Sequence, residues 1–138
     1  MRDKVFLDTN ILVYLYSETE PEKRQIAIDN MKRYICFTST QAINEFSNVL
    51  SGKWKLSSST VKQAILQINS VCEIVINDLS VIYHALELRE KYKFSFFDTL
   101  MLSSAILNNC DYIFSEVMHD GQKIAGLEII NIFKRGNF

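Results

Sequence analysis

The sequence predicts an α/β protein: a doubly wound, mainly parallel five-stranded sheet flanked by helices in three α/β/α layers. Short apolar runs alternate with segments of about 10 to 15 residues that have helical periodicity. These runs are mainly apolar rather than alternating, as is typical of strands that are buried on both faces of a sheet. Only four glycines and one proline occur in 138 residues, so long regular elements joined by short loops should dominate.

Each expected strand is one of these apolar runs, and together they cover residues 5–7, 35–37, 72–76, 112–114 and 128–132. Helices are expected to begin near residue 11, to run from 22 to 34 and from 79 to about 92, and to follow three capping-box spacings. These spacings pair a hydroxyl residue with a residue three positions later: Thr38 with Gln41, Thr60 with Gln63, and Ser95 with Asp98. Asn77 and Asp78 can cap the helix that starts at residue 79.

Length and composition predict a single domain over residues 1–138, because there is no room for a second core. No apolar run reaches the roughly 18 residues of a membrane span. The net charge of −1 excludes a strongly basic nucleic-acid binder but leaves a local basic patch possible. The three cysteines lack paired spacing, which indicates ordinary thiols in a reducing cytoplasm. We therefore expect a cytoplasmic protein.

Acidic residues follow the expected strands at positions that could share one cleft. Asp8 ends the first strand and Glu116 follows the fourth, while Glu45 and Asp98 lie in helices. Ligands of open α/β sheets bind outside the carboxyl ends of the strands. Carboxylates gathered there repel each other unless a cation compensates, and an all-oxygen set suits Mg²⁺ or Mn²⁺. Such a site can activate water against a phosphodiester, which is nuclease or phosphatase chemistry.

Each acid also has a purely structural interpretation. Asp98 can serve only as part of the Ser95 cap, and Asp8 only as a favourable charge at a helix N-terminus. Glu45 is equally typical of a solvated helix face, and Glu116 and Asp120 lie in a loop, where acids are common. The set of positions, rather than any one residue, favours a shared site.

Basic and aromatic residues offer a weaker prediction of RNA binding. Lysines could contact phosphates and Trp54 could stack on a base, although a solvated face is the commoner role of such clusters. The candidates are Lys53, Trp54, Lys55, Lys91 and Lys93. No glycine-rich phosphate loop or serine-nucleophile motif is present.

Four motifs in register resemble the PIN domain family over essentially the whole chain. They are V-F-L-D-T-N at 5–10, N-E-F at 44–46, F-F-D-T-L at 96–100 and F-S-E at 114–116. Within that family the chain looks most like the VapC-type toxins of toxin–antitoxin modules. The resemblance implies a Mg²⁺- or Mn²⁺-dependent endoribonuclease that cuts RNA, commonly tRNA or ribosomal RNA.

The resemblance also implies roles for individual residues. Asp8, Glu45 and Asp98 would hold the metal and position the attacking water. Thr9 and Ser115 match hydroxyl positions that assist the site, and Asn10, which could otherwise cap a helix, matches a residue that orients the first acid. A homodimer and a small cognate antitoxin are further expectations.

One departure from the family concerns the fourth acid. The branch that this chain resembles usually has Asp directly after Ser-Glu, where this chain has Val117. Glu116 or Asp120 could substitute as a catalytic or metal-binding acid, although neither is the matching residue. Val117 makes a catalytically impaired PIN domain that binds RNA or an antitoxin one alternative. A second alternative is a haloacid-dehalogenase-like phosphatase, because D-T-N at 8–10 after a strand also resembles the start of that family. The phosphatase would need an acid where this chain has Asn10.

Overall fold

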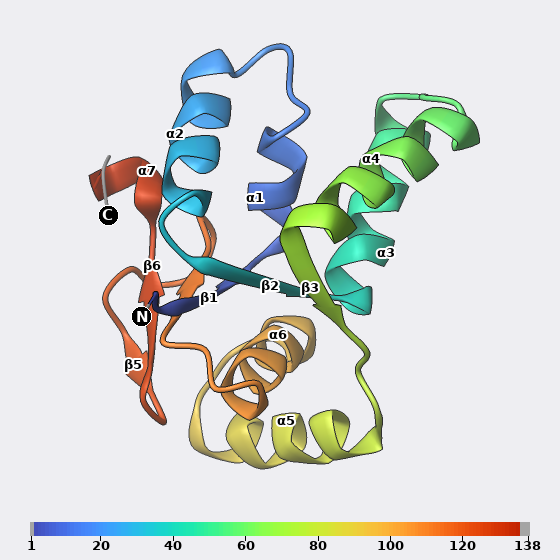
Figure 1. Ribbon diagram of the computed structural model, residues 1–138. Helices are drawn as coiled ribbons and strands as arrows, with labels where there is room; N and C mark the ends of the chain where they lie inside the picture. Colours follow the sequence, from blue (N-terminus) through green and yellow to red (C-terminus); the bar gives the residue numbers. More distant parts are fainter. Residues whose placement is uncertain (1, 136–138) are drawn as a thin grey trace.

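A six-stranded sheet in the order β3-β2-β1-β4-β6-β5 forms the centre of the computed structural model, which describes residues 2–135 (Figure 1). Every neighbouring pair is parallel except β5 and β6, which are antiparallel. The strands are β1 (Lys4–Leu7), β2 (Ile35–Ser39), β3 (Cys72–Val75), β4 (Tyr112–Phe114), β5 (Lys123–Ile124) and β6 (Leu127–Ile130). The chain winds outward from β1 to β3 and then in the other direction from β4, so the winding reverses between β1 and β4.

The predicted class, a mainly parallel sheet within three layers, is confirmed. The count of five strands was one too low, because β5 is an additional strand of two residues. It pairs with β6 through the registers Lys123 with Glu128 and Ile124 with Leu127. A hairpin arm this short carries no apolar run of its own, which is why the pattern did not indicate it.

Helices cover both faces of the sheet (Figure 1). The helices α1 to α4 lie on one face, whereas α6 packs on the opposite face with α5 outside it. Their bounds are α1 (Thr9–Tyr14), α2 (Pro21–Met31), α3 (Thr40–Asn48), the π-helical turn η1 (Val49–Lys53), α4 (Ser58–Val71), α5 (Leu79–Lys91), α6 (Phe96–Leu107) and α7 (Ile132–Arg135). The helix predicted over 22–34 is shorter than expected and ends at Met31.

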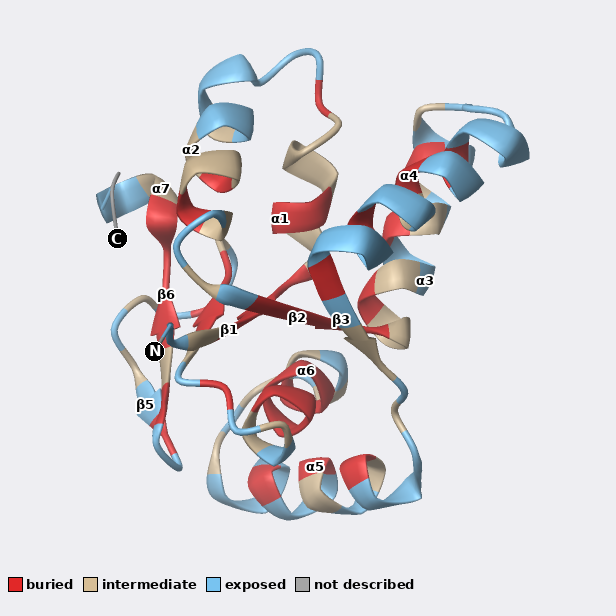
Figure 2. Ribbon diagram, in the orientation of Figure 1, coloured by how far each residue is buried: buried red, intermediate tan, exposed pale blue. Residues whose placement is uncertain are grey.

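The central strands β2, β1 and β4 are buried beyond their first residues, as their mainly apolar sequences predict (Figure 2). Val5, Phe6 and Leu7 of β1 have no exposed surface, and neither do Ile113 and Phe114 of the neighbouring β4. Both faces of these strands are therefore covered, and the first polar residue after each strand lies at the edge of the core.

Two of the predicted helix caps were wrong. Thr38 belongs to β2 and donates to the carbonyl of Leu7 at 2.9 Å, while its neighbour Ser39 caps α3. Ser57, rather than Thr60, caps α4 by accepting from the backbone N–H of Thr60. The caps predicted at Asp78 and Ser95 are confirmed, because both side chains accept from a backbone N–H three residues later.

The described helices include none that is both long and apolar enough to cross a bilayer. The ends of the predicted 1–138 domain, residues 1 and 136–138, lie outside the described part of the chain.

Candidate functional site

Asp8 lies where β1 ends, at the point where the winding of the sheet reverses. Its side chain is 5% exposed and accepts three hydrogen bonds. The backbone N–H of Thr9 donates to Oδ1 at 2.7 Å, and the Ser115 hydroxyl donates to Oδ2 at 2.7 Å. The Asn10 amide donates to Oδ2 at 3.3 Å, and its own oxygen accepts from the backbone N–H of Glu116. The carboxylate of Asp8 is therefore held in one orientation by residues that follow β1 and by Ser115, which follows β4.

The electrostatic environment of Asp8 disfavours its charged form. Burial raises the pKa of Asp8, and the negative charges of Asp98 and Glu45 raise it further. The hydrogen bonds from Ser115 and Thr9 act in the opposite direction, but the net pKa stays above its usual value. Three carboxylates thus interact across this region, and a cation among them would relieve the repulsion.

Glu45 is positioned by side chains from two helices, α1 and its own α3. It is exposed on α3, and its Oε1 accepts from the Thr9 hydroxyl at 2.9 Å. Its Oε2 accepts from the Gln41 amide at 2.9 Å, and the same amide donates to the Phe97 carbonyl at 3.2 Å. Gln41 thereby links α3 to the first turn of α6. Its site role was missed because the sequence analysis assigned Gln41 to a helix cap, although its spacing of four residues from Glu45 was visible.

Asp98 is presented by the first turn of α6. Its backbone N–H donates to the Ser95 hydroxyl at 3.2 Å, so the predicted cap exists. This cap uses the backbone of Asp98, which leaves its half-buried carboxylate free to face the cavity described next. The structural and the functional interpretations of Asp98 are therefore compatible.

Asp8, Glu45 and Asp98 line one open cavity of ≈ 450 Å³. Thr9 and Asn10 line it as well, and so do Lys53, Trp54 and Val117. All the acidic donors are oxygens, which suits Mg²⁺ or Mn²⁺. Among residues 2–135, however, no three acidic, histidine or cysteine side chains are close enough together to form a complete metal site. The donor chemistry fits a divalent cation that keeps part of its water shell.

Glu116 does not line this cavity. Its carboxylate accepts from the Tyr14 hydroxyl at 2.6 Å and forms an ion pair with Lys23 at 2.5 Å. Burial raises the pKa of Glu116, but the hydrogen bonds from Lys23 and Tyr14 and the charge of Lys23 outweigh burial and lower it overall. Glu116 is thus a paired carboxylate outside the cavity.

Asp120 is also placed elsewhere. It accepts from the backbone N–H of Asn131 at 2.8 Å and pairs with Arg135 at 3.3 Å. The backbone hydrogen bond, aided by Arg135, lowers the pKa of Asp120. Val117 occupies the cavity wall instead, with a side chain that is 70% exposed. The structure therefore brings together three of the five predicted acids.

The basic candidates divide in the same way. Lys53 and Trp54 line the cavity, whereas Lys55, Lys91 and Lys93 do not. Lys91 lies over the ring of Tyr92 at 5.9 Å. Of the five RNA-binding candidates predicted from the sequence, only the adjacent Lys53 and Trp54 therefore line the carboxylate cavity.

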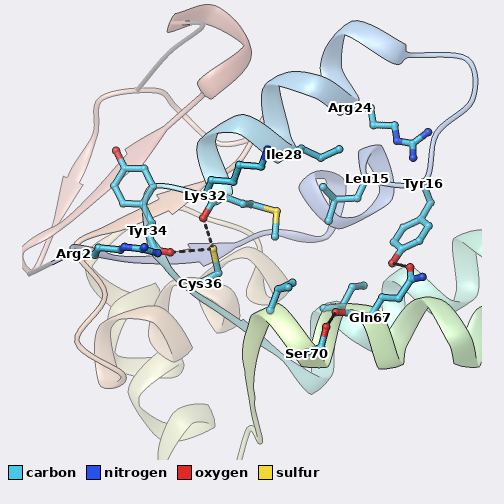
Figure 3. Close-up of a pocket in the computed structure, with 13 residues that line it drawn as sticks. Arg2, Leu15, Tyr16, Arg24, Ile28, Lys32, Tyr34, Cys36, Gln67 and Ser70 are labelled. Atoms are coloured by element: carbon cyan, nitrogen blue, oxygen red, sulfur yellow. Dashed lines mark hydrogen bonds between the residues drawn. The ribbon is translucent and has the colours of Figure 1, made fainter.

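A larger cavity of ≈ 570 Å³ lies between α2 and α4 and has a different chemistry (Figure 3). Its wall is mainly apolar, with Leu15, Ile28 and Cys36 among the lining residues, and its lining includes no carboxylate among the described residues. Three cations, Arg2, Arg24 and Lys32, also line it. This cavity therefore lacks the carboxylates that could hold a metal for phosphodiester hydrolysis, whereas the cavity of Asp8, Glu45 and Asp98 has them.

Comparisons with known proteins bear on the family and the fold of the chain. A model of the PIN domain matches residues 5–116. A chain of a toxin–antitoxin complex from Klebsiella pneumoniae superposes with a TM-score of 0.69 and 22% identity, covering 89% of this chain and 94% of that one. Rickettsia felis VapBC2, bound to a DNA fragment from its promoter, superposes with a TM-score of 0.67 and 19% identity. The match covers 91% of this chain and 96% of that one.

A third similar structure is Mycobacterium tuberculosis VapC20, a toxin that cleaves the sarcin–ricin loop. Its TM-score is 0.64 at 14% identity, and the match covers 82% of this chain and 91% of that one. At these identities the likeness establishes a shared fold. No curated protein matches the sequence.

Proposed function

The chain belongs to the PIN domain family, and we propose that it is a metal-dependent endoribonuclease, the toxin of a toxin–antitoxin pair. The observation that carries this proposal is the cavity that Asp8, Glu45 and Asp98 all line, at the reversal of the sheet. VapC20, which shares the fold, cleaves the sarcin–ricin loop, and RNA is accordingly the proposed substrate here. A tRNA or a ribosomal RNA is the substrate that the sequence resemblance implies.

Asp8, Glu45 and Asp98 would hold Mg²⁺ or Mn²⁺, in part through water. Such an ion would lower the pKa of a bound water and neutralise charge at the phosphodiester. The residues of the chain fix the acids: Ser115, Asn10 and the backbone of Thr9 orient Asp8. The Thr9 hydroxyl and Gln41 orient Glu45. Glu116 and Asp120 are not included in this proposed ligand set, because each is engaged by a cation outside the cavity.

The partner and the compartment are proposed on similar grounds. Chains of toxin–antitoxin complexes share this fold, which supports a cognate antitoxin. A homodimer follows from the family resemblance, and a cytoplasmic location follows from the three cysteines without paired spacing. An inactive binding module is the second candidate function, because Val117 stands where the resembled branch usually has its fourth acid, although a different carboxylate, that of Glu20, also lines the cavity.

Cleavage of total tRNA and ribosomal RNA by the purified chain tests the proposal. Parallel reactions contain Mn²⁺, Mg²⁺ or EDTA, and the Asp98→Asn variant is compared with the wild type. We expect discrete fragments that require both the metal and Asp98, with a circular dichroism spectrum unchanged by the substitution. Cleavage that persists in Asp98→Asn would contradict the assignment. Intact RNA together with a metal-induced rise in Tm would favour the inactive binding module.

A further inference from the structure

A π-helical turn carries the chain from α3 to the wall of the carboxylate cavity. Residues Val49–Lys53 form η1 directly after α3, and the backbone N–H of Trp54 donates to the Val49 carbonyl at 3.0 Å. Lys55 then adopts a left-handed backbone conformation with φ of 56°, which ends the turn. Wide π turns and left-handed non-glycine residues are both uncommon and concentrate at functional sites. This unusual backbone brings Lys53 and Trp54 into the cavity wall.

Two kinds of surface meet in that cavity. Four acids supply negative charge: Asp8, Glu20, Glu45 and Asp98. The aromatic Trp54 and Tyr14 and the aliphatic Val13, Val49 and Val117 supply the apolar part of the wall. Trp54 is half-buried and packs against the main core, so part of its side chain is anchored while part remains accessible. Among the described lining residues, Lys53 alone carries a positive charge. The cavity therefore combines acids for a metal with an anchored aromatic ring and one cation.

We propose that Trp54 is a base-stacking residue that selects an unpaired nucleotide beside the scissile phosphate, and that Lys53 pairs with a neighbouring phosphate. The inference deepens the proposed ribonuclease function and rests on it for the cleavage measurements. A cavity of ≈ 450 Å³ lies within the range of small-ligand sites and has room for one nucleotide rather than a helix. A base inside a duplex presents no free face to an indole, whereas the bases of single strands and loops do.

The chain contains a single tryptophan, so its fluorescence reports on this wall directly. The Asp98→Asn variant in Mg²⁺ is titrated with a single-stranded 12-nucleotide oligoadenylate and with a blunt 12-base-pair RNA duplex. We expect saturable quenching of Trp54 by the single strand and roughly tenfold or weaker affinity for the duplex. Equal quenching by the two probes, or no quenching by either, would overturn the proposal.

Substitutions separate stacking from a merely structural role of Trp54. In the wild-type background, Trp54→Leu should raise KM for RNA cleavage by roughly tenfold while kcat changes little, and Trp54→Phe should restore most of the loss. Binding of a 2-aminopurine-labelled strand follows the same variants without the tryptophan signal. An unchanged KM in a folded Trp54→Leu protein would contradict stacking. If the leucine variant does not fold, Trp54→Phe is tested alone, and a folded Trp54→Phe protein with a strongly raised KM would contradict stacking.

Lys53 and Lys55 form a matched pair for the phosphate contact, because they are two residues apart and only Lys53 lines the cavity. Lys53→Gln should weaken binding of the single strand. It should also reduce the number of salt ions released on binding, given by the slope of log K against log salt concentration, by about one. Lys55→Gln should change neither quantity. Equal effects of the two substitutions would show a diffuse surface charge and overturn the role of Lys53. If the wild type cleaves no RNA but the single strand still quenches Trp54 selectively, the nuclease proposal fails and the stacking proposal is supported.

Discussion

The Ser115 hydroxyl donates a 2.7 Å hydrogen bond to the Asp8 carboxylate across 107 positions of sequence. Both residues follow the ends of neighbouring parallel strands, β4 and β1, and both are buried. The same hydroxyl oxygen accepts from the backbone N–H groups of Val117 and Met118 at 3.3 Å. Ser115 thus couples the orientation of Asp8 to the loop that follows β4.

Ser115→Ala should lower cleavage by roughly 10- to 100-fold, as loss of a group that orients a metal ligand commonly does. Burial raises the pKa of Asp8 and the Ser115 hydrogen bond lowers it, so removing that bond raises the pKa further. The charged form is then reached at a higher pH, and the acidic limb of the pH–rate profile should move upward. Ser47→Ala, which removes a hydroxyl bonded to the Ile43 carbonyl, should leave that limb in place.

Mn²⁺ should raise the Tm of the wild type, because a ligand that binds only the native state stabilises it. At 100 times its Kd, such a ligand contributes about 2.7 kcal/mol. Glu45→Gln and Asp98→Asn should each reduce the metal-induced shift, measured by calorimetry. Glu116→Gln serves as the control, since Glu116 is held by Lys23 outside the cavity. If Glu116→Gln lost the Mn²⁺-induced rise in Tm, Glu116 would have to be counted among the metal ligands.

Glu116→Gln should instead change stability in a pH-dependent way. Burial raises the pKa of Glu116, but Lys23 and Tyr14 more than compensate and lower it. A lowered carboxyl pKa stabilises the fold above the unfolded-state pKa, and this contribution disappears as pH falls through the folded-state pKa. The variant should have a lower Tm than the wild type at pH 7, and the two should converge in acid.

The magnitude of this pair is best measured by a double-mutant cycle with Lys23→Met. The side chains of Lys23 and Glu116 are 33% and 26% exposed, so a coupling of about 1 kcal/mol or less is expected. Lys23 also lies 4.9 Å from the centre of the Tyr14 ring, and Lys23→Met removes that contact as well. A coupling energy near zero at neutral pH would show that the ion pair contributes nothing to stability.

Val117→Asp should add a carboxylate to the cavity wall and tighten metal binding. The Val117 side chain is 70% exposed and lines the cavity with Asp8 and Asp98, so the substitution disrupts no core packing. We expect half-maximal cleavage at a Mn²⁺ concentration several-fold lower than in the wild type. Val71→Asp, at a 62% exposed valine of the α2–α4 cavity, is the matched control and should not shift the metal dependence. Identical behaviour of the two variants would contradict a role for position 117.

The strands of the sheet were predictable because burial on both faces requires a short, mainly apolar run of residues, which is visible in the local sequence. The cap at Thr38 was not, because Thr38 and Ser39 are adjacent hydroxyl residues and tertiary contacts decide between them. Strand β2 extends to Ser39, which is in register with Val75 of β3, and the Thr38 hydroxyl bonds Leu7. The helix can begin only after that pairing ends.

The candidate site was predictable to a similar extent. Asp8 follows a buried strand, so its place at the edge of the sheet could be inferred from local sequence. The partner of Glu116 could not, since Lys23 lies 93 residues away and nothing near either residue indicates the pair. The π turn at Val49–Lys53 has no sequence signal either, and it decides that Lys53 rather than Lys55 reaches the cavity.

The contact between Asp8 and Ser115 has a consequence for synthesis of the protein. A ribosome makes β1 early, but β1 lies between β2 and β4, and β4 comes more than a hundred residues later. Parallel pairings over such separations form slowly, because closing a long loop precedes the stabilising contacts. A growing chain has neither Asp98 nor Ser115 until most of it has been translated. The proposed RNA hydrolysis therefore requires a nearly complete chain and should begin only near the end of translation.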